Sequence, residues 1–459
     1  MTVNDWINKN KETVNGRYKP KFHMTAPIGW INDPNGFVYF KGAYHLFYQY
    51  HPYNAKWGPM HWGHAKSSDL IHWEHLPVAL VPDQDYDQAG CFSGTALVVG
   101  ETLVLMYTGH TVTTGHVRQV QCIATSTDGV NFEKSPNNPV IDERHTKNTT
   151  DFRDPKLIKR GDRYYALIAS TENKVGNVLL FESMDLASWS FKSVFLEAEK
   201  NQGSIWECPD LFTLGDKDVL IVSPIAYQPD EFRFTNVNSS VWFIGQVDWE
   251  NGRFLVESVE EIDRGLDFYA PQTLMDNQGR RIMIAWEQMW GRNIPTDDLG
   301  HQWAGMMTIP RQLTYQEGRI KQDLVSEFYD QFILSEQVAV TGEYETELVP
   351  LLEAELSSDF VIQIGTEIEY FEISYAQEIL TINRHAAGHL IKADQNESVI
   401  RQARLICDKI KLTLVTDVST CELLINQDLV FSTTFYPTQE SGKIRMQAER
   451  FKVTTYQDK

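Results

Sequence analysis

The sequence of 459 residues has little cysteine and an excess of negative charge, and each of these features excludes a class of protein. Five cysteines are present, widely spaced and without a Cys-X-X-Cys pair, which excludes a disulfide framework and a zinc signature and favours a reducing compartment. Lys and Arg number 41 against 62 Asp and Glu, for a net charge of −21. Such a surface disfavours nucleic acids and anionic membranes as partners and suits small neutral substrates.

Long apolar runs and helical periodicity are also scarce. Met1 to Pro20 is polar and charged, without the apolar core of a secretion signal, and no stretch approaches the length of a membrane span. We therefore expect no secretion signal, no membrane anchor and a cytoplasmic location. Hydrophobic residues make up 42% of the chain and aromatic residues 12%, which is enough for a sizeable core.

The sequence does contain many short segments that are typical of strands. Runs rich in Val, Ile, Leu, Tyr and Phe, such as 102–107 and 163–168, alternate with clusters of Gly, Pro, Asn and Asp. β-Branched and aromatic residues between turn residues favour strands. The fold class is therefore expected to be all-β.

A repeat divides the first two thirds of the chain. Segments 67–73, 126–132 and 183–189 share a Ser-X-Asp pattern followed by an aromatic residue, and a weaker copy lies at 248–254. Their aspartates, which we interpret as turn caps, lie 57 to 63 residues apart. A period of about 60 residues accommodates the four strands of a propeller blade with long loops. Four copies and room for a fifth predict five blades.

The repeat ends near residue 315, and the remainder has a different pattern. Strand-like runs in the last part of the chain alternate as in a sandwich with one solvated face. We therefore predict a five-bladed β-propeller followed by a C-terminal β-sandwich. The expected boundaries are an N-terminal extension at 1–21, the propeller at 22–330, a connector at 331–338 and the sandwich at 339–459.

Three short motifs place acidic residues beside turn-forming residues: Asn-Asp33-Pro-Asn-Gly, Arg-Asp154-Pro and Trp-Glu207-Cys-Pro-Asp. Taken singly, each fits a turn, a surface ion pair or a solvated strand end. Their spacing favours a site instead, because Asp33, Ser93, Asp154, Glu207 and Tyr269 follow one another at intervals of 60, 61, 53 and 62 residues. Equivalent positions in successive blades lie on one rim around the propeller axis, so these residues should converge on one funnel.

Three carboxylates in one pocket suit glycoside hydrolysis. One attacks the anomeric carbon, one protonates the leaving oxygen, and one holds the sugar. Carboxylates packed together push their pKa values apart, which allows one of them to remain protonated as the acid.

In this order, the three motifs resemble the signatures of the β-fructofuranosidases, glycoside hydrolase family 32, which includes invertases, sucrose-6-phosphate hydrolases and fructan hydrolases. The similarity covers nearly all of the chain after about residue 20. The fold of that family, a five-bladed propeller followed by a β-sandwich, agrees with the repeat. The resemblance implies a retaining hydrolase, without a cofactor, that cleaves the β-fructofuranosyl bond of sucrose, sucrose 6-phosphate or a short fructan.

The resemblance also implies roles for individual residues. Asp33 would be the nucleophile, Glu207 the general acid and then the base, and Asp154 a partner of the fructosyl hydroxyls. Arg153 would orient the Asp154 carboxylate, and Tyr269 would lie near Glu207. The other residues of the implied substrate-binding pocket are Trp30, Ile31, Asn32, Gln49, Trp57, Phe92, Ser93 and Trp286.

Two other functions fit parts of the pattern. An inverting arabinan or xylan hydrolase on a five-bladed propeller also uses three carboxylates, but the complete motifs and the sandwich argue against it. A carbohydrate-binding propeller without catalysis need not keep all three acids. We expect no metal site, because His61 and His64 lack a carboxylate or cysteine partner pattern. We interpret Cys208 as a packing residue.

The sequence constrains the identity of the substrate less than it constrains the type of reaction. A β-fructosidase of this length that works in a reducing compartment resembles the bacterial sucrose-6-phosphate hydrolases. We therefore expect cleavage of sucrose and sucrose 6-phosphate and little action on long fructans. No Gly-rich nest or cluster of cations for a phosphate is visible in the sequence.

Overall fold

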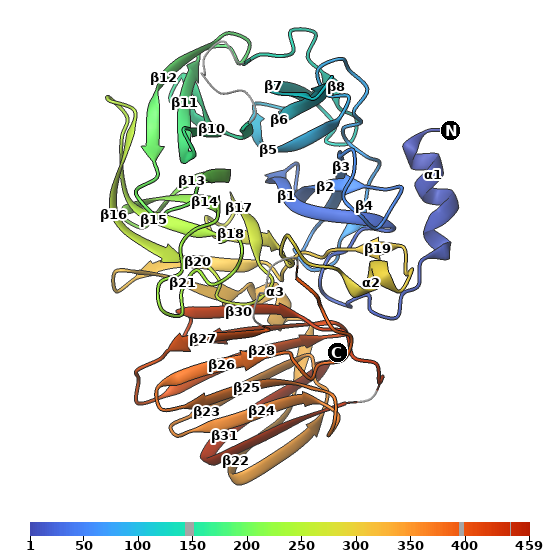
Figure 1. Cartoon of the computed structure of the whole chain (residues 1–459), viewed down its shortest axis with the longest axis vertical. Helices are drawn as coiled ribbons and strands as arrows, with labels where there is room; N and C mark the ends of the chain where they lie inside the picture. The colour runs from blue at the N-terminus through green and yellow to red at the C-terminus, as the bar shows by residue number, and fades with distance from the viewer. Residues whose placement is uncertain (143–150, 394–398, 441) are drawn as a thin grey trace.

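The structure, a computed structural model, describes residues 1–142, 151–393, 399–440 and 442–459. Five antiparallel sheets are arranged around a common axis in the upper part of Figure 1, and a sheet domain built from the C-terminal residues lies below them. The prediction of a five-bladed propeller followed by a β-sandwich is confirmed.

Each blade begins with its innermost strand and runs outward. Hydrogen bonding between consecutive strands gives four-stranded meanders, as the repeat of about 60 residues predicts. The strands of the five blades are β1 (Gly29–Phe40), β2 (Ala43–His51), β3 (His61–Ser67) and β4 (Glu74–His75); β5 (Gly90–Val99), β6 (Thr102–Thr113), β7 (His116–Ser126) and β8 (Glu133–Lys134); β9 (Phe152–Arg160), β10 (Arg163–Glu172), β11 (Val175–Ser183) and β12 (Trp189–Glu197); β13 (Ile205–Leu214), β14 (Lys217–Ile225), β15 (Val241–Asp248) and β16 (Arg253–Glu261); and β17 (Tyr269–Met275), β18 (Arg281–Trp286), β20 (Arg311–Gln316) and β21 (Arg319–Leu324).

The repeated aspartates cap turns between the two outer strands of their blades, as expected from the sequence. Asp69 accepts hydrogen bonds from the backbone of Ile71 and His72 at 3.0 and 2.8 Å. Asp128 and Asp185 accept the equivalent backbone bonds at 2.8 to 2.9 Å. These aspartates therefore stabilise the blades and lie outside the site.

The N-terminal segment crosses from the propeller to the sandwich. Helix α1 (Val3–Asn10) has a capping box at Thr2 and Asp5, and the short helix η1 (Lys11–Thr13) follows it. The chain then runs along the sandwich, where the backbone of Lys21 and Phe22 donates to Asp417, before it enters β1. Strand β19 (Trp303–Ala304) pairs in parallel with the start of β1. Because β19 belongs to the insertion after β18, which also includes helix α2 (Pro295–Asp298), this insertion fixes the start of β1.

The sandwich follows the short helix α3 (Ser326–Tyr329). Its last strand, β31, connects two sets of strands: β24 to β27 on one side, and β23 with β28 to β30 on the other. Residues 443–448 of this strand pair with β24, whereas residues 451–456 pair with β23. The segment expected to be a connector contains the start of β22. The strands are β22 (Phe332–Glu347), β23 (Leu351–Leu356), β24 (Phe360–Gly365), β25 (Tyr370–Ala376), β26 (Ile379–Asn383), β27 (Ile400–Arg404), β28 (Ile410–Asp417), β29 (Thr420–Ile425), β30 (Leu429–Thr434) and β31 (Lys443–Asp458).

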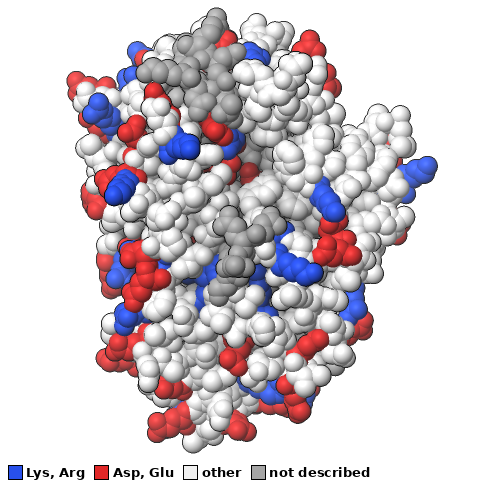
Figure 2. Space-filling model, in the orientation of Figure 1, with Lys and Arg blue, Asp and Glu red and all other residues white. Residues whose placement is uncertain are grey.

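The charged side chains are spread over the surface. On the face shown in Figure 2, acidic and basic side chains are mixed around the rim, and Lys and Arg gather where the propeller meets the sandwich. Among the described residues, no helix has the length and apolar character that a membrane span requires.

Candidate active site

The innermost strands of the five blades share one irregularity, and it lies at the predicted site residues. In each blade the regular pairing of this strand with its neighbour shifts by one residue, which locally twists the strand and redirects its side chains. The shifts fall between Ile31 and Pro34 on β1, Phe92 and Gly94 on β5, Glu207 and Asp210 on β13, and Tyr269 and Gln272 on β17, and opposite Leu167 to Ala169 for β9.

Three residues at these shifts have left-handed backbone conformations although they are not glycines. The φ angles of Asp154, Cys208 and Ala270 are 62°, 49° and 51°. Such conformations cost about 1–3 kcal/mol each and persist where the surrounding structure enforces them. For Asp154, the Thr108 hydroxyl accepts the backbone N–H at 2.9 Å and supplies part of that enforcement.

Asp33 is buried and is held through both carboxylate oxygens. Ser93 Oγ donates to Asp33 Oδ2 at 2.7 Å, and Asn32 Nδ2 donates to Asp33 Oδ1 at 3.0 Å. Burial raises the pKa of the Asp33 carboxyl, the bonds from Ser93 and Asn32 oppose that rise, and the charge of Glu207 adds to it. The side chain is therefore oriented by hydrogen bonds in a place where its charge is costly.

Cys208 connects Asp33 with Asp154. Its backbone N–H donates to Asp154 Oδ2 at 3.0 Å, and its thiol lies 3.5 Å from Asp33 Oδ2 and 3.6 Å from Asp154 Oδ2. Burial and the nearby carboxylates raise the pKa of this thiol well above its usual range, so the sulfur keeps its proton and can donate it in a weak bond. As the sequence predicts, Cys208 packs in an apolar cluster with Tyr269 and Ala270. It is also a hydrogen-bonding partner of both carboxylates.

The environment of Asp154 is also unfavourable for a negative charge. Burial raises the pKa of its carboxyl, the Arg153 guanidinium opposes this, and the charges of Glu207 and Asp33 reinforce it. The three carboxyl groups therefore interact electrostatically within one site, as their spacing in the sequence predicts.

Glu207 is held at both oxygens by residues from two other blades. Arg153 Nη2 and Nε donate to Glu207 Oε1 at 2.9 and 3.2 Å, and Tyr269 Oη donates to Glu207 Oε2 at 2.6 Å. Arg153 also forms a longer ion pair with Asp154, with Nε 4.0 Å from Asp154 Oδ2. Its hydrogen bonds go to Glu207, and the expectation that it orients Asp154 stays a prediction. The expectation that Tyr269 lies near Glu207 is met by direct contact.

The expected polar binding residues lie around Asp33. Asn32 bonds Asp33 and accepts from Trp30 Nε1 at 2.8 Å. Gln49 donates to the carbonyl of Cys91, next to the segment that carries Ser93, at 3.0 Å. Asn32 therefore contacts Asp33 directly, whereas Gln49 contacts the strand that carries Ser93.

The expected aromatic residues divide into exposed and buried members. Trp57 is 49% exposed and meets Phe92 edge to face, with ring centroids 6.1 Å apart. Phe92 stacks on His110 at 4.1 Å, and sequence reasoning did not single out this histidine. Trp286 is fully buried, and its ring centroid lies 5.7 Å from that of Trp30. It therefore packs behind Trp30 and is not itself exposed.

Ile31 does not belong to the site. Its side chain is fully buried in the apolar core with residues such as Leu46 and Ile284. Neighbouring side chains along a strand point to opposite faces, so Ile31 points away from the face that presents Trp30 and Asn32. Its assignment as a substrate-binding residue is therefore wrong.

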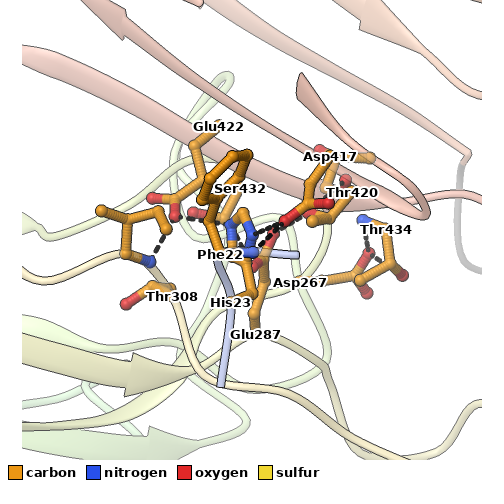
Figure 3. Close-up of polar contacts among 12 residues, drawn as sticks. Phe22, His23, Asp267, Glu287, Thr308, Asp417, Thr420, Glu422, Ser432 and Thr434 are labelled. Carbon is orange, nitrogen blue, oxygen red and sulfur yellow. Dashed lines mark hydrogen bonds and ion pairs between the residues drawn. The ribbon is translucent and has the colours of Figure 1, made fainter. Parts of the chain in front are cut away.

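A second group of titratable side chains joins the two domains (Figure 3). His23 from the N-terminal segment, Glu287 from the propeller and Glu422 from the sandwich are fully buried, with one ligand-type atom from each within 4.8 Å of the others. His23 Nδ1 lies 3.0 Å from Asp417, and Nε2 lies 3.1 Å from Glu422 and 3.4 Å from Glu287. Burial opposes a charge here, but these carboxylates raise the pKa of His23 to about 10. The geometry therefore fits a protonated imidazole between carboxylates.

Comparisons with known proteins agree with this fold. The model described as "Glycosyl hydrolases family 32 N-terminal domain" matches residues 23–327, and that of the family 32 C-terminal domain matches residues 334–458. The chain is 35% identical to a sucrose-6-phosphate hydrolase of Zymomonas mobilis, over 98% of this chain and 94% of that protein. It is 33% identical to a sucrose-6-phosphate hydrolase of Escherichia coli, over 96% of this chain and 94% of that protein.

Solved structures give the same result. A β-fructofuranosidase of Bombyx mori, solved as a mutant in complex with sucrose, superposes with a TM-score of 0.89 at 34% identity, over 100% of this chain and 97% of that chain. A sucrose-6-phosphate hydrolase of Lactobacillus gasseri superposes with a TM-score of 0.90 at 25% identity, over 99% of this chain and 96% of that chain.

A propeller whose axial site holds three carboxyl groups, followed by a β-sandwich, defines a glycoside hydrolase. The chain belongs to glycosyl hydrolase family 32. It is an enzyme of the β-fructofuranosidase type, which retains the configuration of the anomeric carbon.

Proposed function

We propose that the enzyme cleaves sucrose and sucrose 6-phosphate, with Asp33 as the nucleophile and Glu207 as the acid and base. The observation that carries this proposal is the contrast between the two side chains. Asp33 accepts hydrogen bonds from Ser93 and Asn32. Glu207 instead accepts hydrogen bonds from the Arg153 guanidinium on one oxygen and from the Tyr269 hydroxyl on the other. Two carboxyl groups in different environments suit two different roles.

The proposed reaction has two steps. In the first, an Asp33 oxygen attacks the anomeric carbon of the fructosyl unit, the glycosidic C–O bond breaks, and the leaving oxygen takes a proton from Glu207. In the second, Glu207 accepts a proton from water, the water oxygen bonds to the anomeric carbon, and the Asp33 carboxylate leaves. Atoms and charges balance over the two steps, and the enzyme returns to its starting state.

Asp154 is proposed to hold the fructosyl unit. Its carboxyl lies beside Asp33, joined to it by Cys208, and can accept hydrogen bonds from sugar hydroxyls. Such bonds strengthen as positive charge develops on the sugar ring in the transition state. We propose Trp57 and Phe92 as the apolar surface near the mouth, since Trp57 is exposed and rests against Phe92.

The choice of substrates is supported by the relatives. Relatives from Zymomonas mobilis, Escherichia coli and Bacillus subtilis that align over more than 90% of this chain are named sucrose-6-phosphate hydrolases. Another, from Escherichia coli, is named raffinose invertase and is 40% identical over 67% of this chain. A cytoplasmic location, where sugars phosphorylated during uptake are found, is proposed on the same basis and suits five cysteines that are all free thiols.

The experiment that tests the substrate proposal compares kcat/KM for sucrose, sucrose 6-phosphate, a short inulin-type oligomer and a levan-type oligomer. At a net charge of −21, a phosphate-binding site must overcome long-range repulsion with local cations. A preference for the phosphorylated sugar should then weaken as salt rises, because screening acts on the charged substrate. Equal values for both sugars at low and high salt would contradict a phosphate site, and a higher value on the fructans would contradict the proposed substrates.

A further inference from the structure

The sandwich contacts the propeller along the loop that leads to Tyr269. This loop, residues 262–268, joins β16 to β17 and lies against the edge strand β30. The backbone N–H groups of Arg264 and Asp267 donate to the carbonyls of Val430 and Ser432 at 2.7 and 3.0 Å. The approach is close, because a Cβ on Gly265 would meet Ser432 O at 2.1 Å. The loop therefore follows the course of β30.

Two aspartates of this loop bond the sandwich through their side chains: Asp263, which accepts from Ser432, and Asp267, which accepts from Thr434 (Figure 3). The Asp267 carboxylate is fully buried, and its Oδ2 accepts hydrogen bonds from the backbone N–H and the hydroxyl of Thr434 at 2.8 and 2.9 Å. Arg384 of the sandwich and Arg292 of the propeller form ion pairs with it. Burial alone would raise the pKa of Asp267, but the two guanidinium groups and Thr434 bring it below its usual range. The carboxylate is therefore a charged anchor with partners in both domains.

The Asp267 anchor lies two residues before Tyr269, which contacts Glu207 in the active site. Tyr269 is fully buried, and its hydroxyl lies 2.6 Å from Glu207 Oε2 and 3.1 Å from the carbonyl of Ser223. The intervening Phe268 is buried in the propeller core, where the Arg311 guanidinium lies 5.2 Å from its ring centroid. Little freedom remains between Asp267 and Tyr269, so a displacement of the anchor would be transmitted to the phenol.

We propose that Thr434 and Arg384 of the sandwich are positioning residues for the hydrolytic reaction. They hold Asp267, Asp267 fixes the start of β17, and β17 places the Tyr269 hydroxyl on Glu207. The sandwich thereby sets the geometry of the acid and base of the propeller, although neither residue touches the substrate. This inference rests on the proposed role of Glu207.

The test uses the full chain and two variants, Thr434→Val and Arg384→Met, beside Tyr269→Phe. Tyr269→Phe removes a hydrogen bond from Glu207 Oε2, so it should change the alkaline limb of the kcat/KM profile on sucrose. We expect the two sandwich variants to move the limb in the same direction and to lower kcat by roughly tenfold with little change in KM, because a displaced catalytic group loses orientation. Thr434→Ser, which keeps the hydroxyl, should restore the wild-type profile.

The chain offers a matched control on the same strand. Thr433 is buried beside Thr434, and its hydroxyl has no hydrogen-bond partner among the described residues. Thr433→Val should therefore leave the pH profile and kcat unchanged. Adding Arg384→Met to Tyr269→Phe should also cost much less than the roughly tenfold loss of the single change, because both act through one contact.

Two different failures can be separated. Thr434→Val and Arg384→Met proteins with lowered thermal stability but wild-type kcat and alkaline limb would overturn the positioning role and leave only a structural one. The same profile measured on Glu207→Gln tests the underlying assignment. If that variant keeps the wild-type alkaline limb, the proposed role of Glu207 is wrong, whatever the sandwich variants do.

Discussion

The guanidinium of Arg153 bonds Glu207 in preference to its chain neighbour Asp154. Arg153 Nη2 lies 2.9 Å from Glu207 Oε1, whereas Arg153 Nε lies 4.0 Å from Asp154 Oδ2. With Tyr269 on its second oxygen, Glu207 has a fixed orientation, which a group that gives and then takes a proton at the same place needs. Asp154 instead depends on Cys208 for its hydrogen bonds.

The first prediction concerns Glu207 itself. Glu207→Gln should lower kcat/KM on sucrose by about a thousandfold, because the leaving oxygen then receives no proton from this position. The alkaline limb should disappear, and an aryl fructoside with a good leaving group should recover part of the rate, since it needs no acid. Wild-type enzyme on the same aryl substrate is the control. A variant that keeps the alkaline limb on sucrose would assign the acid to another residue.

The second prediction concerns the acid limb. Asp33 must be ionised to attack, and burial raises the pKa of its carboxyl while the bond from Ser93 opposes the rise. Removing that bond in Ser93→Ala should raise the pKa further, so the acid limb of kcat/KM should move to higher pH. The matched control is Ser126→Ala, whose hydroxyl bonds the turn-capping Asp128 at the outer part of the same blade. An acid limb that stays in place or moves to lower pH would contradict this description of Asp33.

The third prediction concerns stability at the domain interface. The pKa of His23 is raised to about 10, above the ordinary value of 6.5, so its charge stabilises the fold fully below pH 6.5. This contribution is lost as pH rises through about 10. The thermal midpoint of the wild type should therefore fall over that range.

Removing the imidazole tests the origin of that pH dependence. His23→Asn should be less stable by about 3–5 kcal/mol near neutral pH, because buried carboxylates lose their cation, and the fall toward pH 10 should be smaller. His385→Asn, which changes an exposed histidine, is the control. Thermal scans from pH 6 to pH 10 on the three proteins make the comparison. A midpoint in His23→Asn that matches the wild type across the range would show that this cluster is not charged as described.

Much of the site could be predicted from sequence because each blade repeats one arrangement. The spacing of Asp33, Asp154 and Glu207 follows the blade period, so their convergence needed no knowledge of the packing. The partners of those residues depend on backbone detail that the repeat does not specify. Arg153 bonds Glu207 at a strand irregularity where the next residue, Asp154, has a left-handed backbone.

The interface between the domains could not be predicted in the same way. His23 and Glu422 are 399 residues apart, and Asp267 and Thr434 are 167 apart, and neither pair is related by the repeat. Their side chains are polar, and polar side chains are mostly exposed in proteins. Only the three-dimensional structure shows that they are buried against one another. Ile31 shows the opposite error, since its place in a motif suggested a contact that the alternation along a strand rules out.

The identity of the nucleophile is tested most directly by trapping the covalent intermediate. Glu207→Gln lacks the base of the second step, so an aryl fructoside that reacts without an acid should leave the enzyme carrying a fructosyl group. Rapid acid quenching, proteolysis and mass spectrometry would then locate that group. We predict that it is bound to the peptide that contains Asp33, and that it is absent when Asp33→Asn is added. A fructosyl group on Asp154 or another residue, or an inverted product formed without any labelled peptide, would contradict the proposed mechanism.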